Sequence, residues 1–356
     1  MGEAANERDG RLRMIRDSAA GIAAAGDLGR IRRLRFTEPG FDRATWAEMA
    51  ALGWPGLCVA EADGGSGFGA AELCALAEVL GAALVPEPMI AAAVIAPLLD
   101  AATRDEVLAG RRIVLPAWTE RAAALPAALP TGPATRLGSG RITGTLRFIP
   151  MAAGADAFLV RAREGIALVV RDAAGAVLTT ERTQDGGHFG TLSLEDAPAR
   201  VLPGDVDAAI EATTLATAAE LLGLAERAFA ITLDYLRTRV QFGRAIGSFQ
   251  ALQHRAADLR LQLALARASI DAAAITLDAG ASPDTARAAV SRAKARASDM
   301  ALLVTRQAIQ LHGGIGYTDE HEIGLYLRRA MVLANLHGSA ALHRARYAAL
   351  APEEDD

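Results

Sequence analysis

The sequence predicts an α+β protein that is mostly α-helical, with an N-terminal helical domain, a small middle β-domain and a C-terminal four-helix bundle. Three observations support this order. Apolar residues recur at three- and four-residue intervals up to about residue 110 and again after Pro203, as in helices that face a core. Short β-type runs separated by Gly, Asp and Pro lie between those stretches. The chain has 356 residues, 51% of them hydrophobic, which is enough for a large core in two or three parts.

The N-terminal helical domain is expected over residues 1–112. Its helical period is clearest in AELCALAEVLGAALV and AAAVIAPLLDAAT, which Gly and Pro interrupt. The middle β-domain is expected over residues 113–203, because the runs IVLPAW, RITGTLRFI, DAFLVRA, IALVVRD, AVLTT and TLSLED have β-type composition. Residues 121–133 (RAAALPAALPTGP) are interpreted as a loop inside this domain and not as an interdomain linker.

The C-terminal four-helix bundle is expected over residues 204–350, followed by an acidic tail at 351–356. Long helical periods predict its helices at residues 207–237, 248–279, 283–311 and 320–349. Antiparallel packing of such helices is the simplest way to bury their apolar faces.

Charge, cysteine content and hydropathy limit the partners and the location that are expected for this protein. The 42 acidic and 37 basic residues give a net charge of −5, which provides no basic field for nucleic acid. Cys58 and Cys74 lack metal-ligand spacing and are expected as buried thiols in a reducing compartment. The charged N-terminus and the interrupted apolar runs predict a cytoplasmic protein without a membrane span.

Two motifs combine polar groups with glycine-broken loops. In residues 237–258 (RTRVQFGRAIGSFQALQHRAAD), Arg239 offers a planar fork suited to a diphosphate, Gly243 permits a turn, and Ser248 is placed to cap the next helix. The second motif, QLHGGIGY at residues 310–317, places a Gln and a Gly pair at an expected helix end.

Together with LGWPGLCVAEADGGSGFG (52–69) and ITGTLRFIPMAAGADAFLV (142–160), these motifs resemble the acyl-CoA dehydrogenase family over about residues 34–349. The resemblance implies that family's fold, an FAD cofactor and α,β-dehydrogenation of an acyl-CoA thioester, with electrons passed on to an electron-transfer acceptor. In the family a carboxylate base removes the α-proton while hydride passes from the β-carbon to flavin N5. The flavin ribityl hydroxyl and the backbone N–H of the base polarise the thioester carbonyl.

Both positions at which the family carries its base hold other residues in this sequence. Histidine His337 stands in place of the glutamate of an E-G-T tripeptide, and Thr213 stands at the alternative position on the helix before RTRVQFG. Glu211 falls where some relatives have an aspartate that contacts pantetheine, so it is expected to bind substrate. Glu220 shares a helix face with Thr213 but lies about 10 Å along the axis, and it is interpreted as a solvated or bundle-capping charge.

The residues implied for FAD binding form two sets, because in the family a neighbouring subunit reaches the diphosphate and adenine. The neighbour-facing set is well kept: Arg239, Gln241, Phe249, Gln250, Gln310, Gly313 and Gly314. The set that faces the flavin ring within the same subunit is eroded. Thr119, Phe148 and Ser339 remain, but WTERAAA lacks the Gly-Ser of the family motif. Pro150 replaces a hydroxyl residue and has no N–H to donate, and Ala341 replaces a glutamine.

This pattern resembles the short acyl-CoA dehydrogenase subunits that form heterotetramers with two copies of each of two chain types. In these, one chain type carries the base and the other supplies part of the cofactor site, and some members act on bulky acyl-CoAs such as steroid side chains. The chain is therefore expected to bind acyl-CoA together with an FAD that a second subunit shares or supplies. Two alternatives stay open: a self-sufficient homotetramer (a dimer of dimers) with His337 as an unusual base, and a flavoprotein of this fold without dehydrogenase activity.

Overall fold

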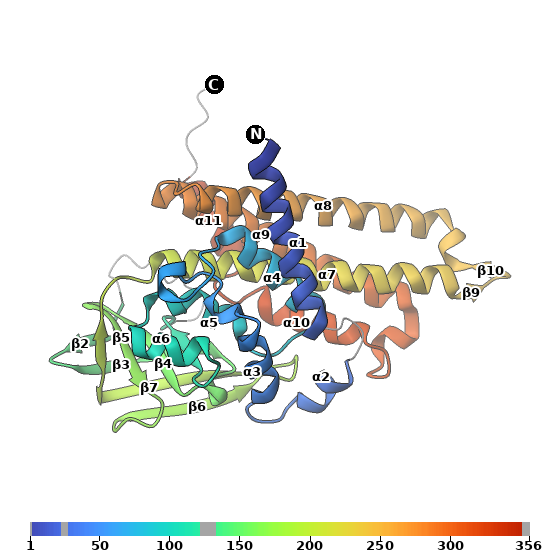
Figure 1. Ribbon diagram of the computed structural model, residues 1–356. Coiled ribbons are helices and arrows are strands. Elements are labelled where there is room, and N and C mark those ends of the chain that lie inside the picture. Colours follow the sequence, from blue (N-terminus) through green and yellow to red (C-terminus); the bar gives the residue numbers. More distant parts are fainter. Residues whose placement is uncertain (1, 23–27, 122–132, 351–356) are drawn as a thin grey trace. The chain divides into compact units, whose positions relative to one another are not determined.

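The computed structural model describes residues 2–22, 28–121 and 133–350 (Figure 1). Most of the expected loop at 121–133 and the whole acidic tail at 351–356 lie outside the described residues. The described elements are mainly helices with a smaller set of strands, which confirms the α+β, mostly α fold class. The chain forms two compact units. The first contains Met1–Ile22, Gly29–Leu73 and Pro86–Thr214, and the second contains Ala23–Leu28, Cys74–Val85 and Leu215–Asp356.

The first unit carries the N-terminal helices. These are α1 (Gly2–Ile22), α2 (Gly29–Leu34), α3 (Arg43–Ala51), α5 (Met89–Ile95) and α6 (Ala101–Leu108), while α4 (Ala70–Ala82) continues into the second unit. Aspartates define two of the helix starts. Asp42 accepts a hydrogen bond from the N–H of Ala44 at 2.8 Å, and Asp100 accepts one from the N–H of Thr103 at 3.2 Å. Each carboxylate satisfies a backbone donor that the helix itself leaves unpaired.

The strands of the first unit form two sheets of four strands, with the orders β1-β4-β5-β8 and β2-β3-β7-β6. Their bounds are β1 (Val114–Ala117), β2 (Arg136–Gly138), β3 (Arg141–Pro150), β4 (Ala157–Ala162), β5 (Gly165–Val170), β6 (Ala176–Arg182), β7 (His188–Pro198) and β8 (Arg200–Leu202). Strands β1 and β4 pair in parallel, and the other pairs in these sheets are antiparallel. The β3–β7 register shifts between Leu146 and Ile149, which forms a bulge around Phe148.

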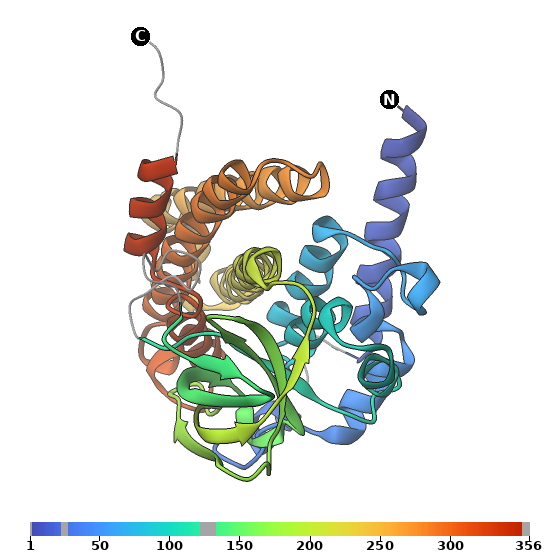
Figure 2. The ribbon, with the colours of Figure 1, turned by 90° about the vertical axis from the view of Figure 1, so that its left-hand side faces the viewer.

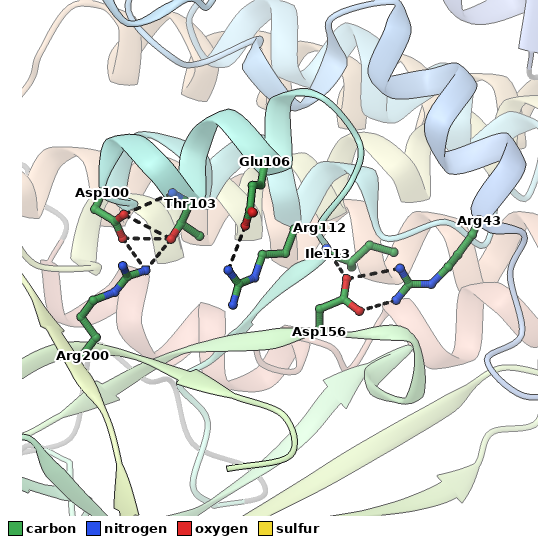
Figure 3. A network of polar contacts seen from close by, with 8 residues as sticks. All are labelled: Arg43, Asp100, Thr103, Glu106, Arg112, Ile113, Asp156 and Arg200. Carbon is green, nitrogen blue, oxygen red and sulfur yellow. Dashed lines mark hydrogen bonds and ion pairs between the residues drawn. The ribbon is translucent and has the colours of Figure 1, made fainter.

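Polar contacts tie the helices of the first unit to its strands (Figure 3). Asp156, which precedes β4, accepts the N–H of Ile113 at 2.8 Å and two hydrogen bonds from Arg43 at 2.7 and 3.3 Å. Asp100 at the start of α6 forms an ion pair with Arg200 of β8 at 2.7 Å. These contacts hold the ends of β4 and β8 against helices that are distant in sequence.

The second unit carries the long C-terminal helices, and Figure 2 shows α7 (yellow) end-on. The bounds are α7 (Asp207–Thr238), which begins in the first unit, α8 (Gln250–Asp278), α9 (Pro283–His312), α10 (Ile323–Leu333) and α11 (Ala340–Leu350). The expectation of one helix over 320–349 is wrong, because the chain breaks between α10 and α11. His337 and Gly338 have φ angles of 59° and 108° there, and a right-handed helix does not continue through such residues.

Helix α7 is long and apolar enough to cross a membrane by length and composition, but 83% of its apolar window is buried in the protein. Such burial is typical of a core helix. Cys74 is buried and Cys58 is half-buried, and both are free thiols.

Within the second unit, α4 and α7 approach with their backbones in direct contact. A Cβ atom on Gly223 would lie 1.9 Å from the carbonyl oxygen of Glu78, and one on Gly81 would lie 2.2 Å from that of Glu220. The crossing therefore requires glycine on both helices. Arg267 of α8 binds the Glu78 carboxylate at 2.6 Å and the Glu226 carboxylate at 2.9 Å, which links three helices.

Gly223→Ala is expected to lower the free energy of unfolding by about 2–3 kcal/mol, because the overlap with Glu78 outweighs the roughly 1 kcal/mol that alanine gains in a helix. Urea denaturation measures this change. Gly10→Ala in α1 is the matched control, since no atom lies within 4 Å of a Cβ at that position. Equal denaturation midpoints for Gly223→Ala and the wild type would show that α4 and α7 can move apart without loss of stability.

Candidate functional site

A two-stranded hairpin projects from the connection between α7 and α8 (Figure 1). Its strands are β9 (Val240–Gln241) and β10 (Arg244–Ala245), and Phe242 and Gly243 form the turn with φ angles of 54° and 79°. The Phe242 side chain is 91% exposed, and its ring packs edge-on against Phe249 with centroids 6.2 Å apart. The Arg244 guanidinium lies 4.2 Å from the centre of the Phe249 ring. Phe249 thus anchors a hairpin whose tip is an exposed aromatic side chain.

Arg239 lies at the base of this hairpin. Its carbonyl accepts the N–H of Ile246 at 2.9 Å, and Gly247 lies so close to Leu236 that a Cβ there would come within 2.8 Å of the Leu236 carbonyl oxygen. Within the described chain the exposed Arg239 guanidinium forms no ion pair or hydrogen bond. An exposed, unpaired guanidinium on a fixed backbone suits a bidentate anion such as a diphosphate.

The QLHGGIGY segment ends α9 near the same hairpin. His312, the last residue of α9, stacks on Tyr235 of α7 with ring centroids 4.4 Å apart, which joins the end of α9 to the helix that leads to Arg239. Gly313 has a φ angle of 65° and stops the helix. Nothing lies within 4 Å of a Cβ at Gly313 or Gly314, so both face open space.

The exposed residues of the second unit therefore include most of the neighbour-facing set expected from sequence. Gln241, Gln250 and Gln310 are exposed and Phe249 is half-buried. The structure brings their two segments together through the contact between Tyr235 and His312.

His337 lies in the break between α10 and α11 and is a weak base. Burial, with a smaller contribution from the charge of Lys294, lowers the pKa of His337 to about 3. An imidazole with this pKa is neutral at physiological pH, and its affinity for a proton is far below that of a base matched to neutral pH. Ser339 lies beyond Gly338, and its hydroxyl accepts the N–H of Leu342 at 3.4 Å at the start of α11. A contact between Ser339 and a cofactor stays a prediction.

The alternative base position on α7 holds no titratable oxygen. Thr213 is 4% exposed, and its hydroxyl donates to the carbonyl of Ala209 at 2.8 Å. Glu211 is also buried, with 5% exposure. Glu220, further along α7, accepts hydrogen bonds from Arg329 of α10 at 2.8 and 3.3 Å, so it is a member of an interhelical ion pair.

The β-domain residues expected near the flavin ring lie around the β3 bulge. Phe148 has a φ angle of 58° and is 38% exposed, with its ring edge-on to Phe189 at 6.0 Å. Non-glycine residues in such a backbone conformation cluster at binding sites. The Thr119 carbonyl accepts the N–H of Arg147 at 2.6 Å, and Pro150 pairs with Phe189 across β3 and β7.

Glu120, next to Thr119, has a structural role that the sequence did not reveal. Its carboxylate accepts the N–H of Ala134 at 2.8 Å and both the N–H and the hydroxyl of Thr135 at 2.6 Å. Although burial opposes ionisation, these hydrogen bonds lower the pKa of Glu120 below its usual range. The carboxylate thus joins residues on either side of the segment 122–132.

Comparisons with known proteins identify the family. Residues 10–108 match the acyl-CoA dehydrogenase N-terminal domain, and residues 206–350 match the acyl-CoA dehydrogenase C-terminal domain. This chain belongs to the acyl-CoA dehydrogenase family. It is therefore a member of a family of FAD-dependent oxidoreductases, as the motifs implied.

Among curated relatives, acyl-CoA dehydrogenase IpdE2 of Mycolicibacterium smegmatis is 33% identical over 319 residues, covering 88% of this chain and 87% of the relative. Acyl-CoA dehydrogenase FadE27 of Mycobacterium tuberculosis is 32% identical over 327 residues, covering 84% and 85%. A variant of the Tcur3481-Tcur3483 steroid ACAD has a TM-score of 0.87 at 31% identity, covering 96% and 98% of the two chains. The ChsE4-ChsE5 complex of Mycobacterium tuberculosis has a TM-score of 0.83 at 26% identity, covering 100% and 99%.

Proposed function

We propose that this chain is the subunit without a catalytic carboxylate in a hetero-oligomeric acyl-CoA dehydrogenase, in which a second subunit supplies the base for α,β-dehydrogenation. The observation that carries this proposal is the chemistry at the two family base positions. His337 is a weakly basic imidazole and Thr213 is a hydroxyl bound to its own helix. Neither accepts a proton readily at neutral pH. Two of the similar structures each carry the names of two proteins, the Tcur3481-Tcur3483 steroid ACAD and the ChsE4-ChsE5 complex, which supports a hetero-oligomer.

FAD fits the residues of the second unit as a ligand that a neighbouring subunit shares. Arg239 would pair with the diphosphate, and the open backbone at Gly313 and Gly314 would admit the adenosine part beside Gln310. The rest of the neighbour-facing set, Gln241, Phe249 and Gln250, lies on and below the hairpin. When bound, FAD supplies the hydride acceptor. Thr119, Phe148 and Ser339 are proposed to contact the cofactor from this chain's own side, and Glu211 to contact the pantetheine.

The substrate proposed is a bulky acyl-CoA, such as one with a steroid side chain. The similarity to a steroid ACAD, at 31% identity over nearly the whole chain, supports this class. The assembly proposed is a cytoplasmic tetramer with two copies of each subunit, which passes its electrons to an electron-transfer acceptor.

Coexpression with a neighbouring gene for a second acyl-CoA dehydrogenase tests the proposal. We expect the two chains to copurify as a yellow complex whose flavin is bleached by acyl-CoA. A chain that purifies alone, holds flavin and is bleached by acyl-CoA would instead be a self-sufficient homotetramer. A yellow complex that acyl-CoA does not bleach would indicate a flavoprotein of this fold without dehydrogenase activity.

Arg239→Ala is expected to lower the flavin content of the assembled oligomer, because a charge-assisted contact to a diphosphate contributes about 1.5–3 kcal/mol, or roughly tenfold or more in affinity. Arg239→Lys restores only part of it, since a point charge does not copy the fork. The ratio of flavin to protein absorbance measures retention. Arg237→Ala is the control, because Arg237 lies two residues away and pairs with the exposed Asp234 at 3.1 Å. Equal losses of flavin in Arg239→Ala and Arg237→Ala would show that Arg239 acts only as a surface charge.

A further inference from the structure

Lys294 of α9 is a fully buried lysine surrounded by oxygen atoms. Its side chain is 0% exposed. Its Nζ lies 3.0 Å from the hydroxyl of Ser298 and 3.2, 3.0 and 3.3 Å from the carbonyl oxygens of Leu333, Ala334 and Gly338. Leu333 and Ala334 end α10, where helix carbonyls have no partner further along the helix. The ammonium thus binds the main chain on both sides of the break between α10 and α11.

His343 of α11 makes a second tie to the same break. Its Nε2 donates to the carbonyl of His337 at 3.0 Å, and its Nδ1 accepts from the hydroxyl of Ser291 at 3.3 Å. Ser291 also accepts a hydrogen bond from Nε of Arg346 at 2.5 Å. We call Lys294, Ser298 and His343 the carbonyl cradle, because together they bind the carbonyls that flank and include position 337.

The cradle surrounds a residue in an unfavourable backbone conformation. His337 has a φ angle of 59°, a left-handed conformation that is uncommon for residues with a Cβ. Within the described part of the chain, its backbone N–H donates no hydrogen bond, whereas its carbonyl is bound by His343. The backbone at position 337 is thus held through its carbonyl while its N–H is left without an acceptor in the described part of the chain.

We propose that Lys294 is a positioning residue, whose ammonium holds the carbonyls on either side of position 337 and so fixes the backbone of the residue at the family's base position. The inference rests on the proposed function in one respect: position 337 matters to catalysis only if its loop borders the flavin and the acyl-CoA. The geometry itself depends on this chain alone.

The charges around Lys294 allow its contribution to be isolated. Burial lowers the pKa of Lys294 to about 7. The titratable groups that face it are His337 in the break and His343 on α11, and burial lowers the pKa of each to about 3. Arg346 contributes a fixed positive charge beside His343. At about pH 6, Lys294 is therefore protonated while both imidazoles are neutral.

Hydrogen exchange of the peptide covering residues 332–343 tests the proposal. The measurement is made on the full chain at about pH 6, where Lys294 carries its ammonium. Lys294→Met removes the ammonium but keeps the apolar stem, and protection of this peptide is expected to fall at least about tenfold in this variant. Arg296→Met on the exposed face of α9 should behave as the wild type does.

Protection of this peptide that is unchanged in Lys294→Met would overturn the proposal. If Lys294→Met also loses protection throughout α8 and α9, the variant has unfolded, and Ser298→Ala, which removes one contact to the Ala334 carbonyl, then decides. Its protection is expected to fall in this peptide alone, and an unchanged value would overturn the proposal. A lysine that only fills the core would change protection in α8 and α9 as much as in this peptide. Neither flavin nor a partner subunit is required, so failure of this proposal is distinct from failure of the coexpression experiment.

Discussion

When the chain is purified alone and supplied with FAD, acyl-CoA is expected to reduce the flavin about 10²- to 10⁴-fold more slowly than in the complex with the partner subunit. This factor is the usual contribution of a general base. The physical reason is the absence of a competent proton acceptor at either family position. His337 has its pKa lowered to about 3, and the hydroxyl of Thr213 is bound to the carbonyl of Ala209. Stopped-flow bleaching of the flavin under excess acyl-CoA measures the rate.

A matched comparison separates the missing base from other defects. Thr213→Glu and His337→Glu each install a carboxylate at one family position. If the base is the missing component, at least one variant should react faster than the wild type in a flavin-loaded sample. If the ring-facing contacts are also lost, both remain slow. Rapid bleaching of the isolated wild-type chain would contradict the expectation.

The isolated chain is also expected to bind FAD several hundredfold or more weakly than the complex, because its own site lacks two hydrogen bonds of about 1.5–3 kcal/mol to the flavin edge and only the complex adds the partner subunit's contacts. Pro150 has no N–H to donate. The Glu120 carboxylate is already committed to Ala134 and Thr135, so it does not replace the lost Gly-Ser contacts. Fluorescence titration of apoprotein with FAD measures the dissociation constant for each sample. One tightly held flavin per isolated chain would contradict this prediction.

The fold class was predictable because, in each region of the sequence, the apolar residues follow one dominant pattern, helical or β-type. The long helical periods after Pro203 correspond to α7, α8 and α9. The break between α10 and α11 was missed, because residues 320–349 keep an apolar helical pattern while His337 adopts a left-handed conformation that is uncommon for any residue other than glycine. Gly338 was the available signal, since glycine commonly follows a helix end.

The exposed parts of the candidate site were easier to predict than its buried supports. Arg239 and the Gly313–Gly314 pair stand in local motifs whose turns follow from nearby glycines. The role of Lys294 depends on carbonyls about 40 residues further along the chain, and local sequence carries no information on that contact. Its position on an otherwise apolar face of α9, between Val290 and Val304, was the only local sign of burial.

The central claim is tested most directly by the rate of flavin reduction in the assembled oligomer, measured with His337→Ala in this chain. The claim is that this subunit contributes no base, so the variant oligomer should be reduced by acyl-CoA at the wild-type rate and retain its flavin. A loss of reduction on the scale of a general base, about 10²-fold or more with flavin content unchanged, would show that His337 accepts the proton and that the chain carries its own catalytic base.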